Sequence, residues 1–220
     1  MTVRLFERNR TSTIVVMYSF YLYFLGLSLR NTSKTLVIFK DEKRSHIAVW
    51  NWIQRFGSCQ IYKMKRILAF IIDETFIQIG NQHFWLWFCI ESVHSSILGI
   101  YISEERNMII TEKFIQSLVE KYGRHTVYTE RGTWYNEACK VIGLKHYLNS
   151  SIEKSLMERV NQYFKDRIEC FNDYYPCMQN KCNLFHVHNW IQFFVSMYND
   201  TIIENYFINE LNYRGEDILS

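Results

Sequence analysis

Apolar residues in the first part of the chain recur at the spacing of amphipathic helices. Three segments show this pattern: "IVVMYSFYLYFLG", "LRNTSKTLVIF" and "HIAVWNWIQRFG". Ser28 and Ser45 precede the second and third segments, where a helix N-cap is expected, and Gly26 and Gly57 end the first and third. We therefore expect three short helices within residues 1–58. Such an arrangement is either a DNA-binding helix-turn-helix or a plain three-helix bundle.

From residue 64 onward, strand patterns come first. The runs "KRILAFIIDETFIQIG", "HFWLWFCIES" and "SSILGIYIS" are rich in β-branched and aromatic residues, and Gly80-Asn81 is typical of a hairpin turn. Helix and strand patterns then alternate: helix 111–123 with Thr111 as N-cap, strand 125–129, helix 134–143, strand 145–149 and helix 151–175. This order predicts an α/β domain over residues 64–175, with a mixed sheet flanked by helices. A C-terminal helical tail is expected over residues 176–220.

Residues 11–29 admit a second interpretation. They carry no charge, and their length is close to the roughly 20 residues of a membrane-spanning helix. Three helices with a turn at Gly26 account for the same segment, so we expect no membrane association, and a membrane anchor is the weaker alternative.

Composition and charge narrow the class of protein. Hydrophobic residues make up 48% and charged residues 21% of the 220 residues, as in folded proteins with a core. The six cysteines are scattered, with no recognisable signal peptide before them, so we expect reduced thiols and a cytoplasmic protein. A net charge of +3 is compatible with a nucleic-acid partner but does not require one.

Three acidic residues fall where the predicted fold would gather them. Asp73 lies inside the first strand, where an unpartnered charge is costly; Glu130 follows the fourth strand, and Glu158 lies in the long helix. If the first and fourth strands are neighbours and the helix packs across their ends, the three carboxylates converge. Converging carboxylates need a cation, and two Mg²⁺ or Mn²⁺ ions would suit oxygen ligands and phosphodiester chemistry. The alternative is three unrelated solvated acids among 22.

The long helix and the segment after it carry two further candidate sites. Glu158, Asn161, Gln162 and Lys165 share one helix face, which suits phosphate contacts but is also common on an ordinary salt-bridged surface. The segment "CMQNKCNLFHVH" contains two thiols and two imidazoles that could bind zinc tetrahedrally, unless the first histidine simply caps the next helix. These four residues are Cys177, Cys182, His186 and His188.

Together, these segments resemble the DDE-type insertion-sequence transposases, especially those of archaeal elements. "IIDETFIQIGNQHFWLWFCIES", "YTERGTWYNEACKVIGLKHY" and "EKSLMERVNQYFKDRIECFNDYYPC" are similar to the three catalytic segments of that family. "GLSLRNTSKTL" and "RSHIAVWNWIQRFG" resemble its helix-turn-helix. The resemblance implies a ribonuclease-H-like fold, two divalent metal ions, and strand transfer of an element's own DNA ends.

The resemblance also assigns roles to individual residues. Asp73, Glu130 and Glu158 match the three metal-binding catalytic acids, and Lys165 and Arg167 match the basic pair after the third acid. The family has Asp at the position of Glu130 and Gly at that of Arg131. A catalytically impaired, DNA-binding remnant is therefore the alternative to an active transposase.

The implied partners are DNA and a second copy of the chain. The helix-turn-helix would bind terminal inverted repeats through Lys43, Arg44, His46 and Arg55. Because two element ends must be joined to target DNA, we expect a homo-oligomer that associates with the nucleoid when it binds DNA.

Overall fold

The computed structural model describes residues 11–57, 67–79, 82–169 and 184–216, with the side chains of the last helix described as far as residue 201. The chain divides into two compact units. The helical unit comprises residues 1–61 and 166–197, and the sheet unit comprises residues 62–165 and 198–220.

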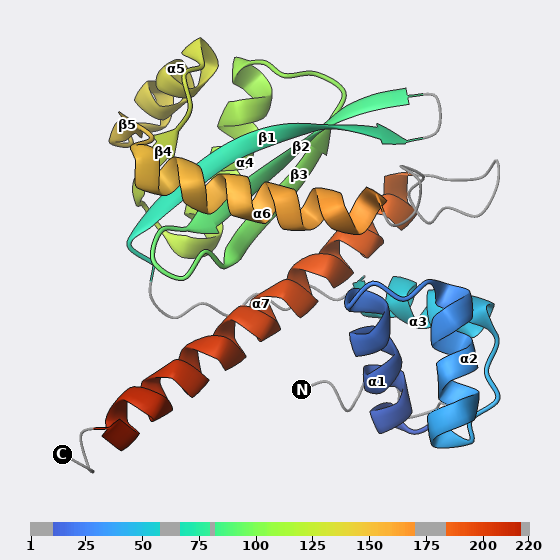
Figure 1. Cartoon of the computed structure of the whole chain (residues 1–220). Helices are drawn as coiled ribbons and strands as arrows, with labels where there is room; N and C mark the ends of the chain where they lie inside the picture. The colour runs from blue at the N-terminus through green and yellow to red at the C-terminus, as the bar shows by residue number, and fades with distance from the viewer. Residues whose placement is uncertain (1–10, 58–66, 80–81, 170–183, 217–220) are drawn as a thin grey trace. The chain divides into compact units, whose positions relative to one another are not determined.

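The helical unit begins with the three predicted helices: α1 (Thr13–Phe24), α2 (Leu29–Lys40) and α3 (His46–Gly57) (Figure 1). The hydroxyl of Ser28 accepts a hydrogen bond from the amide of Asn31, and Ser45 accepts one from Ala48, so both predicted N-caps are confirmed. Gly26 adopts a φ of 116°, which favours glycine in the turn after α1. Residues 11–29 therefore form a helix, a turn and the start of a second helix.

No helix in the described part of the chain combines the length and the apolar run that crossing a membrane requires.

The core of the helical unit includes the first half of α7 (Leu184–Glu216). The ring of Phe20 lies 5.1 Å from that of Phe56 and 5.2 Å from that of Phe193, measured between centroids. A Cβ atom on Gly57 would lie 1.8 Å from the carbonyl oxygen of Asn189, so α3 can end against α7 only with glycine there. Residues from both ends of the sequence thus build this core.

Arg167 is also part of this core. It is 6% exposed, its guanidinium lies 4.5 Å from the ring centroid of Tyr23, and it donates a hydrogen bond to the Tyr23 carbonyl oxygen. Because its side chain is buried against α1, Arg167 is not among the proposed DNA contacts.

The sheet unit contains five strands in the order β3-β2-β1-β4-β5. Their bounds are Ala69–Ile79 for β1, Gln82–Glu91 for β2, Ile97–Ser103 for β3, Thr126–Thr129 for β4 and His146–Leu148 for β5. The pairs β1–β2 and β2–β3 are antiparallel, whereas β1–β4 and β4–β5 are parallel. The predicted mixed sheet is confirmed, with β1 at its centre.

Helices cover both faces of this sheet (Figure 1). On one face, the core joins Phe70 and Trp87 to residues of α4 (Met108–Tyr122) and α5 (Thr133–Ile142). On the other, the ring of Phe88 lies 5.1 Å from that of Phe164 in α6 (Ser151–Glu169). The predicted α/β fold class, a mixed sheet flanked by helices and preceded by three helices, is confirmed.

Two details differ from the sequence-based expectations. Asn107, rather than Thr111, caps α4: its side chain accepts a hydrogen bond from Ile110 at 3.0 Å, and the Thr111 hydroxyl donates to the Asn107 carbonyl. Asn is a cap at least as good as Thr, so the helix starts one turn earlier. The helix predicted around His186 starts at Leu184, so His186 lies inside it. The Gly80-Asn81 turn lies outside the described residues.

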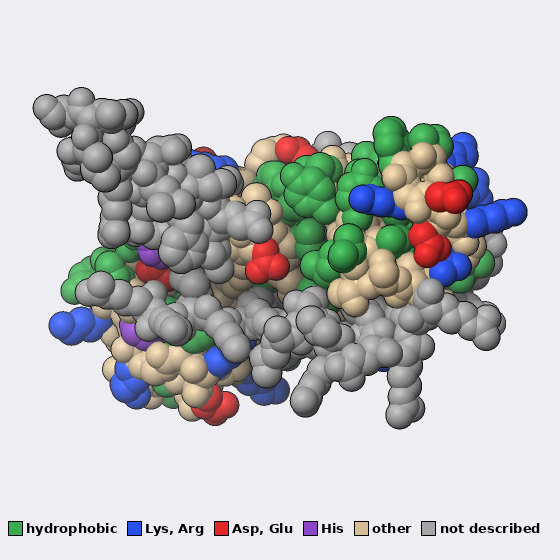
Figure 2. Space-filling model, turned by 90° about the horizontal axis from the view of Figure 1, so that it is seen from below, with side chains coloured by type: hydrophobic (Ala, Val, Ile, Leu, Met, Phe, Trp, Pro, Cys, Tyr) green, Lys and Arg blue, Asp and Glu red, His purple; other side chains and the backbone are tan. Residues whose placement is uncertain are grey.

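Apolar, acidic and basic side chains are interspersed on the surface that Figure 2 shows. Charge alone therefore does not mark a DNA-binding face there, and such a face must be argued from particular residues.

Candidate active site

The register of the parallel strands brings two of the predicted acids to the same edge. Ile72 on β1 and Thr129 on β4 form the last residue pair between these two strands. Asp73 and Glu130 each directly follow that pair. Burial raises the pKa of Asp73 above its usual value, and the negative charge of Glu130 raises it further. The two carboxylates are therefore close enough to repel each other.

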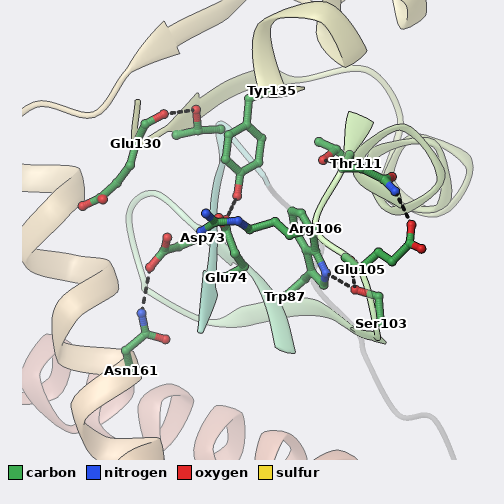
Figure 3. A network of polar contacts seen from close by, with 12 residues as sticks. Asp73, Glu74, Trp87, Ser103, Glu105, Arg106, Thr111, Glu130, Tyr135 and Asn161 are labelled. Atoms are coloured by element: carbon green, nitrogen blue, oxygen red, sulfur yellow. Dashed lines mark hydrogen bonds and ion pairs between the residues drawn. The ribbon is translucent and has the colours of Figure 1, made fainter. Parts of the chain in front are cut away.

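The helix α6 contributes an amide to this edge. The Nδ2 atom of Asn161 donates a 2.9 Å hydrogen bond to a carboxylate oxygen of Asp73 (Figure 3). Its Oδ1 atom is buried and has no hydrogen-bond partner among the described residues. The positive charge of Lys165, one turn further along α6, lowers the pKa of Asp73 and so favours its ionised form. The sequence placed Asn161 on the correct helix face but gave it no role.

Glu158, the third predicted acid, is linked to Glu130 through a lysine. The Nζ atom of Lys154 lies 3.9 Å from a carboxylate oxygen of Glu130 and 3.9 Å from one of Glu158. All three side chains are more than half exposed. Among the described residues, no three carboxylate, imidazole or thiol groups stand together as metal ligands. Glu130 and Glu158 thus share the ammonium group of Lys154, whereas Asp73 is hydrogen-bonded to Asn161.

The available donors nonetheless fit a hard divalent cation. Asp73, Glu130 and Glu158 offer carboxylate oxygens, and Asn161 offers the buried amide oxygen that lacks a partner. An all-oxygen donor set is the type that Mg²⁺ and Mn²⁺ prefer.

The turn that holds Glu130 has a defined structure. The hydroxyl of Thr129 donates to the Glu130 carbonyl oxygen at 2.9 Å. A Cβ atom on Gly132 would come within 2.8 Å of the Trp134 ring and 3.1 Å of the Tyr135 ring. Glycine therefore lets this turn pack directly against the first residues of α5.

A second acid, which was not among the predicted site residues, lies on the opposite face of the sheet. Glu74 has a side chain that is 6% exposed, and it forms a 3.2 Å ion pair with Arg106. The hydroxyl of Tyr135 donates a hydrogen bond to its other carboxylate oxygen (Figure 3). The guanidinium of Arg106 lies between the rings of Trp85 and Trp134, at 4.3 and 4.6 Å from their centroids. In the sequence, the signal that could have identified Glu74 was its place as a second acid inside an apolar strand.

The predicted DNA-binding residues of the helical unit lie in α3 and the loop before it. Lys43 and Arg55 are exposed, and His46 is half-buried at the first position of α3. Arg44 forms a 3.2 Å ion pair with Glu42 and also donates to Thr11.

The predicted zinc residues are only partly described. Cys177 and Cys182 lie outside the described residues. His186 and His188 lie two positions apart on α7, a spacing that points side chains away from each other. Burial lowers the pKa of His188. The zinc site stays a prediction.

Comparisons with known proteins give a family match and a relative that spans most of the chain. A family profile described as a DDE domain matches residues 67–202. The uncharacterized protein MJ0017 of Methanocaldococcus jannaschii is 29% identical over 201 residues, which are 89% of this chain and 90% of that protein.

Solved structures with some similarity include two retroviral integrase domains. The catalytic core domain of BIV integrase is 14% identical, with a TM-score of 0.43, and the match covers 57% of this chain and 80% of that one. The HTLV-2 integrase catalytic core domain in complex with magnesium is 13% identical, also with a TM-score of 0.43, over 56% of this chain and 82% of that one.

Proposed function

Because the chain belongs to the DDE-domain transposases, we propose that it cuts DNA at the ends of its own element and joins those ends to target DNA. The observation that carries the proposal is that Asp73 and Glu130 directly follow Ile72 and Thr129, the last pair between the neighbouring parallel strands β1 and β4. On the same face of the sheet, α6 presents Asn161 to Asp73 and carries Glu158 and Lys165.

Asp73, Glu130 and Glu158 are the residues that would hold two Mg²⁺ or Mn²⁺ ions. When bound, such ions activate the attacking oxygen and stabilise the leaving oxygen of the phosphodiester. Asn161 holds the Asp73 carboxylate in place, and Lys165 supplies a positive charge next to it for a DNA phosphate.

Each proposed step exchanges one phosphorus–oxygen bond for another. In the first, a water oxygen bonds to the phosphorus at the element end, and the strand breaks to leave a 3′-hydroxyl. In the second, that 3′-oxygen bonds to a phosphorus of the target, and the target strand's own 3′-oxygen leaves with a proton. Neither step needs an oxidant or a nucleotide cofactor.

The three helices are proposed to bind the terminal inverted repeats. Lys43 and Arg55 are exposed, and with Arg44 and His46 they surround the start and outer face of α3. Joining two ends at one target requires at least two copies of the chain, so a homo-oligomer on cytoplasmic, nucleoid-associated DNA is part of the proposal.

A second candidate is a remnant that binds DNA without cutting it. Glu130 is one methylene longer than the family's Asp, and its carboxylate pairs with Lys154. Catalytic groups tolerate displacements of only about 0.5 Å, so the longer side chain at this position is the observation behind the second candidate.

One experiment separates the two candidates. The purified chain is incubated with Mn²⁺ and labelled DNA that carries its element's ends, and nicked products are resolved on a denaturing gel. An active transposase nicks this DNA, and Asp73→Ala abolishes the nicking. A remnant binds the same DNA in a gel-shift assay and leaves it intact.

A further inference from the structure

Glu74 occupies an unusual position for a carboxylate. It directly follows Asp73 in β1, and because strand side chains alternate, it points to the opposite face, toward α5. A carboxylate that is only 6% exposed requires partners, and Glu74 has two. Tyr135 donates to one oxygen, and Arg106 pairs with the other.

These two partners come from separate parts of the sheet unit. Tyr135 lies in the first turn of α5, and Arg106 lies in the loop between β3 and α4. The guanidinium of Arg106 is in turn fixed between the rings of Trp85 and Trp134, one from β2 and one from α5. The pair Glu74–Arg106 therefore connects the central strand with two neighbouring elements.

The same tyrosine connects to the turn that carries Glu130. The amide of Tyr135 donates a 3.3 Å hydrogen bond to the Gly132 carbonyl oxygen. Gly132 is also in tight contact with the rings of Trp134 and Tyr135, where a Cβ atom would not fit. A displacement of the Tyr135 ring would therefore displace the backbone between Glu130 and Gly132.

We propose that Glu74, Tyr135 and Arg106 are positioning residues that fix the separation of Asp73 and Glu130 from the far face of the sheet. Glu74 shares a peptide bond with Asp73, and Tyr135 holds the turn that begins at Glu130. The inference rests on the proposed function, because it assumes that the two acids bind metal together. None of the three residues needs to touch DNA.

Tyr135→Phe tests the proposal with the smallest change, since it removes one hydroxyl and keeps the packed ring. Tyr122→Phe is the matched control. Its hydroxyl donates a 2.8 Å hydrogen bond to the Leu98 carbonyl oxygen, in the same unit and away from both acids. Each variant thus loses one hydrogen bond, and we expect the larger decrease in Tm for Tyr135→Phe, because its hydroxyl donates to a charged carboxylate.

The first measurement is the binding of Mn²⁺ alone, followed by electron paramagnetic resonance of the free ion. We expect Tyr135→Phe to weaken binding about tenfold, as is typical when an outer partner of a metal ligand is lost. Tyr122→Phe should bind Mn²⁺ as the natural chain does. Unchanged binding by Tyr135→Phe, or an equal loss in both variants, would overturn the proposal.

The second measurement needs no metal. Hydrogen exchange of the amide at position 135, which donates to the Gly132 carbonyl oxygen, should be faster in Tyr135→Phe than in the natural chain, and unchanged in Tyr122→Phe. If the natural chain binds no Mn²⁺, the proposed function fails, and exchange alone decides the inference. Equal exchange in all three proteins would then rule out a positioning role.

Discussion

The side-chain amide of Asn161 on α6 donates a 2.9 Å hydrogen bond to Asp73 on β1. The two residues are 88 positions apart, and this bond joins the helix that carries Glu158 to the central strand. It also leaves the amide oxygen of Asn161 buried and unpartnered beside the carboxylate.

Replacing Asn161 by Leu should therefore impair the site. The change keeps the volume but removes the donor, so Asp73 loses a partner for its ionised form. We expect cleavage with Mn²⁺ to fall by about 10- to 100-fold. Gln116→Leu is the control, because it makes the same kind of change on α4, where the amide contacts only the exposed Glu120. Equal activity in both variants would exclude a role for Asn161.

The burial of Asp73 predicts a pH-dependent stability. Its pKa is raised in the folded state, mainly by burial, so the folded chain holds this proton to a higher pH than the unfolded chain. The stabilisation from this group is complete below its ordinary pKa and is lost as the pH rises through the raised value. Asp73→Asn removes that loss, because asparagine stays neutral.

In chelator, Asp73→Asn should thus unfold at a higher urea concentration than the natural chain at pH 7. The difference should shrink at pH values below the raised pKa of Asp73. Glu137→Gln, which alters an exposed ion pair with Lys140, should show no such trend. Urea titrations from pH 3.5 to 7 measure this, and a constant difference across that range would contradict the account.

Lys154 should compete with metal for the acids. Its ammonium group lies 3.9 Å from both Glu130 and Glu158, where a divalent ion would also be attracted. Exposed pairs contribute little to stability, so Lys154→Met should leave Tm almost unchanged and tighten Mn²⁺ binding by about two- to fivefold. Lys140→Met, at the exposed pair with Glu137, should not alter Mn²⁺ binding. Weaker binding by Lys154→Met would show that the lysine assists the site instead.

Shortening the second acid should restore the family's arrangement. In Glu130→Asp with Arg131→Gly, the carboxylate retracts by one methylene toward the strand end, and a competing cation is removed. We expect more nicking of element-end DNA than with the natural chain, measured on the same gel. Nicking by the double variant alone would identify the natural chain as the remnant. If neither protein nicks, the enzyme assignment fails for this chain.

DNA binding by the helical unit should depend on its exposed cations. Lys43→Ala with Arg55→Ala should weaken DNA binding and lower the slope of log affinity against log salt concentration by about 1 for each lost phosphate contact. Asn51→Ala, which removes an exposed carboxamide from the same helix, is the control and should not change the salt slope. Circular dichroism should be unchanged in all variants. An unaltered salt slope would place the DNA elsewhere.

The sequence predicted the strands, most of the helix caps and the edge where Asp73 and Glu130 meet, because these features depend on local pattern and parallel pairing. It could not predict the partners of Glu74. Tyr135 is 61 positions away and Arg106 is 32 positions away, and only the folded sheet brings them to the same carboxylate. The link from Lys154 to Glu130 was missed for the same reason. Long-range pairs of this kind leave no periodic signal.

The sequence also could not predict that α7 packs against the first helices. One contact of this packing is the hydrogen bond that Trp190 donates to the hydroxyl of Tyr23, 167 positions away. Residues 184–197 look like an ordinary apolar helix in the sequence. Nothing local specifies that half of this helix completes a core begun near the N-terminus.

The close contact between Gly57 of α3 and Asn189 of α7 has a consequence during synthesis. Helices α1 to α3 leave the ribosome first, but their core is complete only when residues 184–197 have also emerged. A chain that stops before residue 184 therefore leaves this core unfinished, and with it the unit that is proposed to bind DNA.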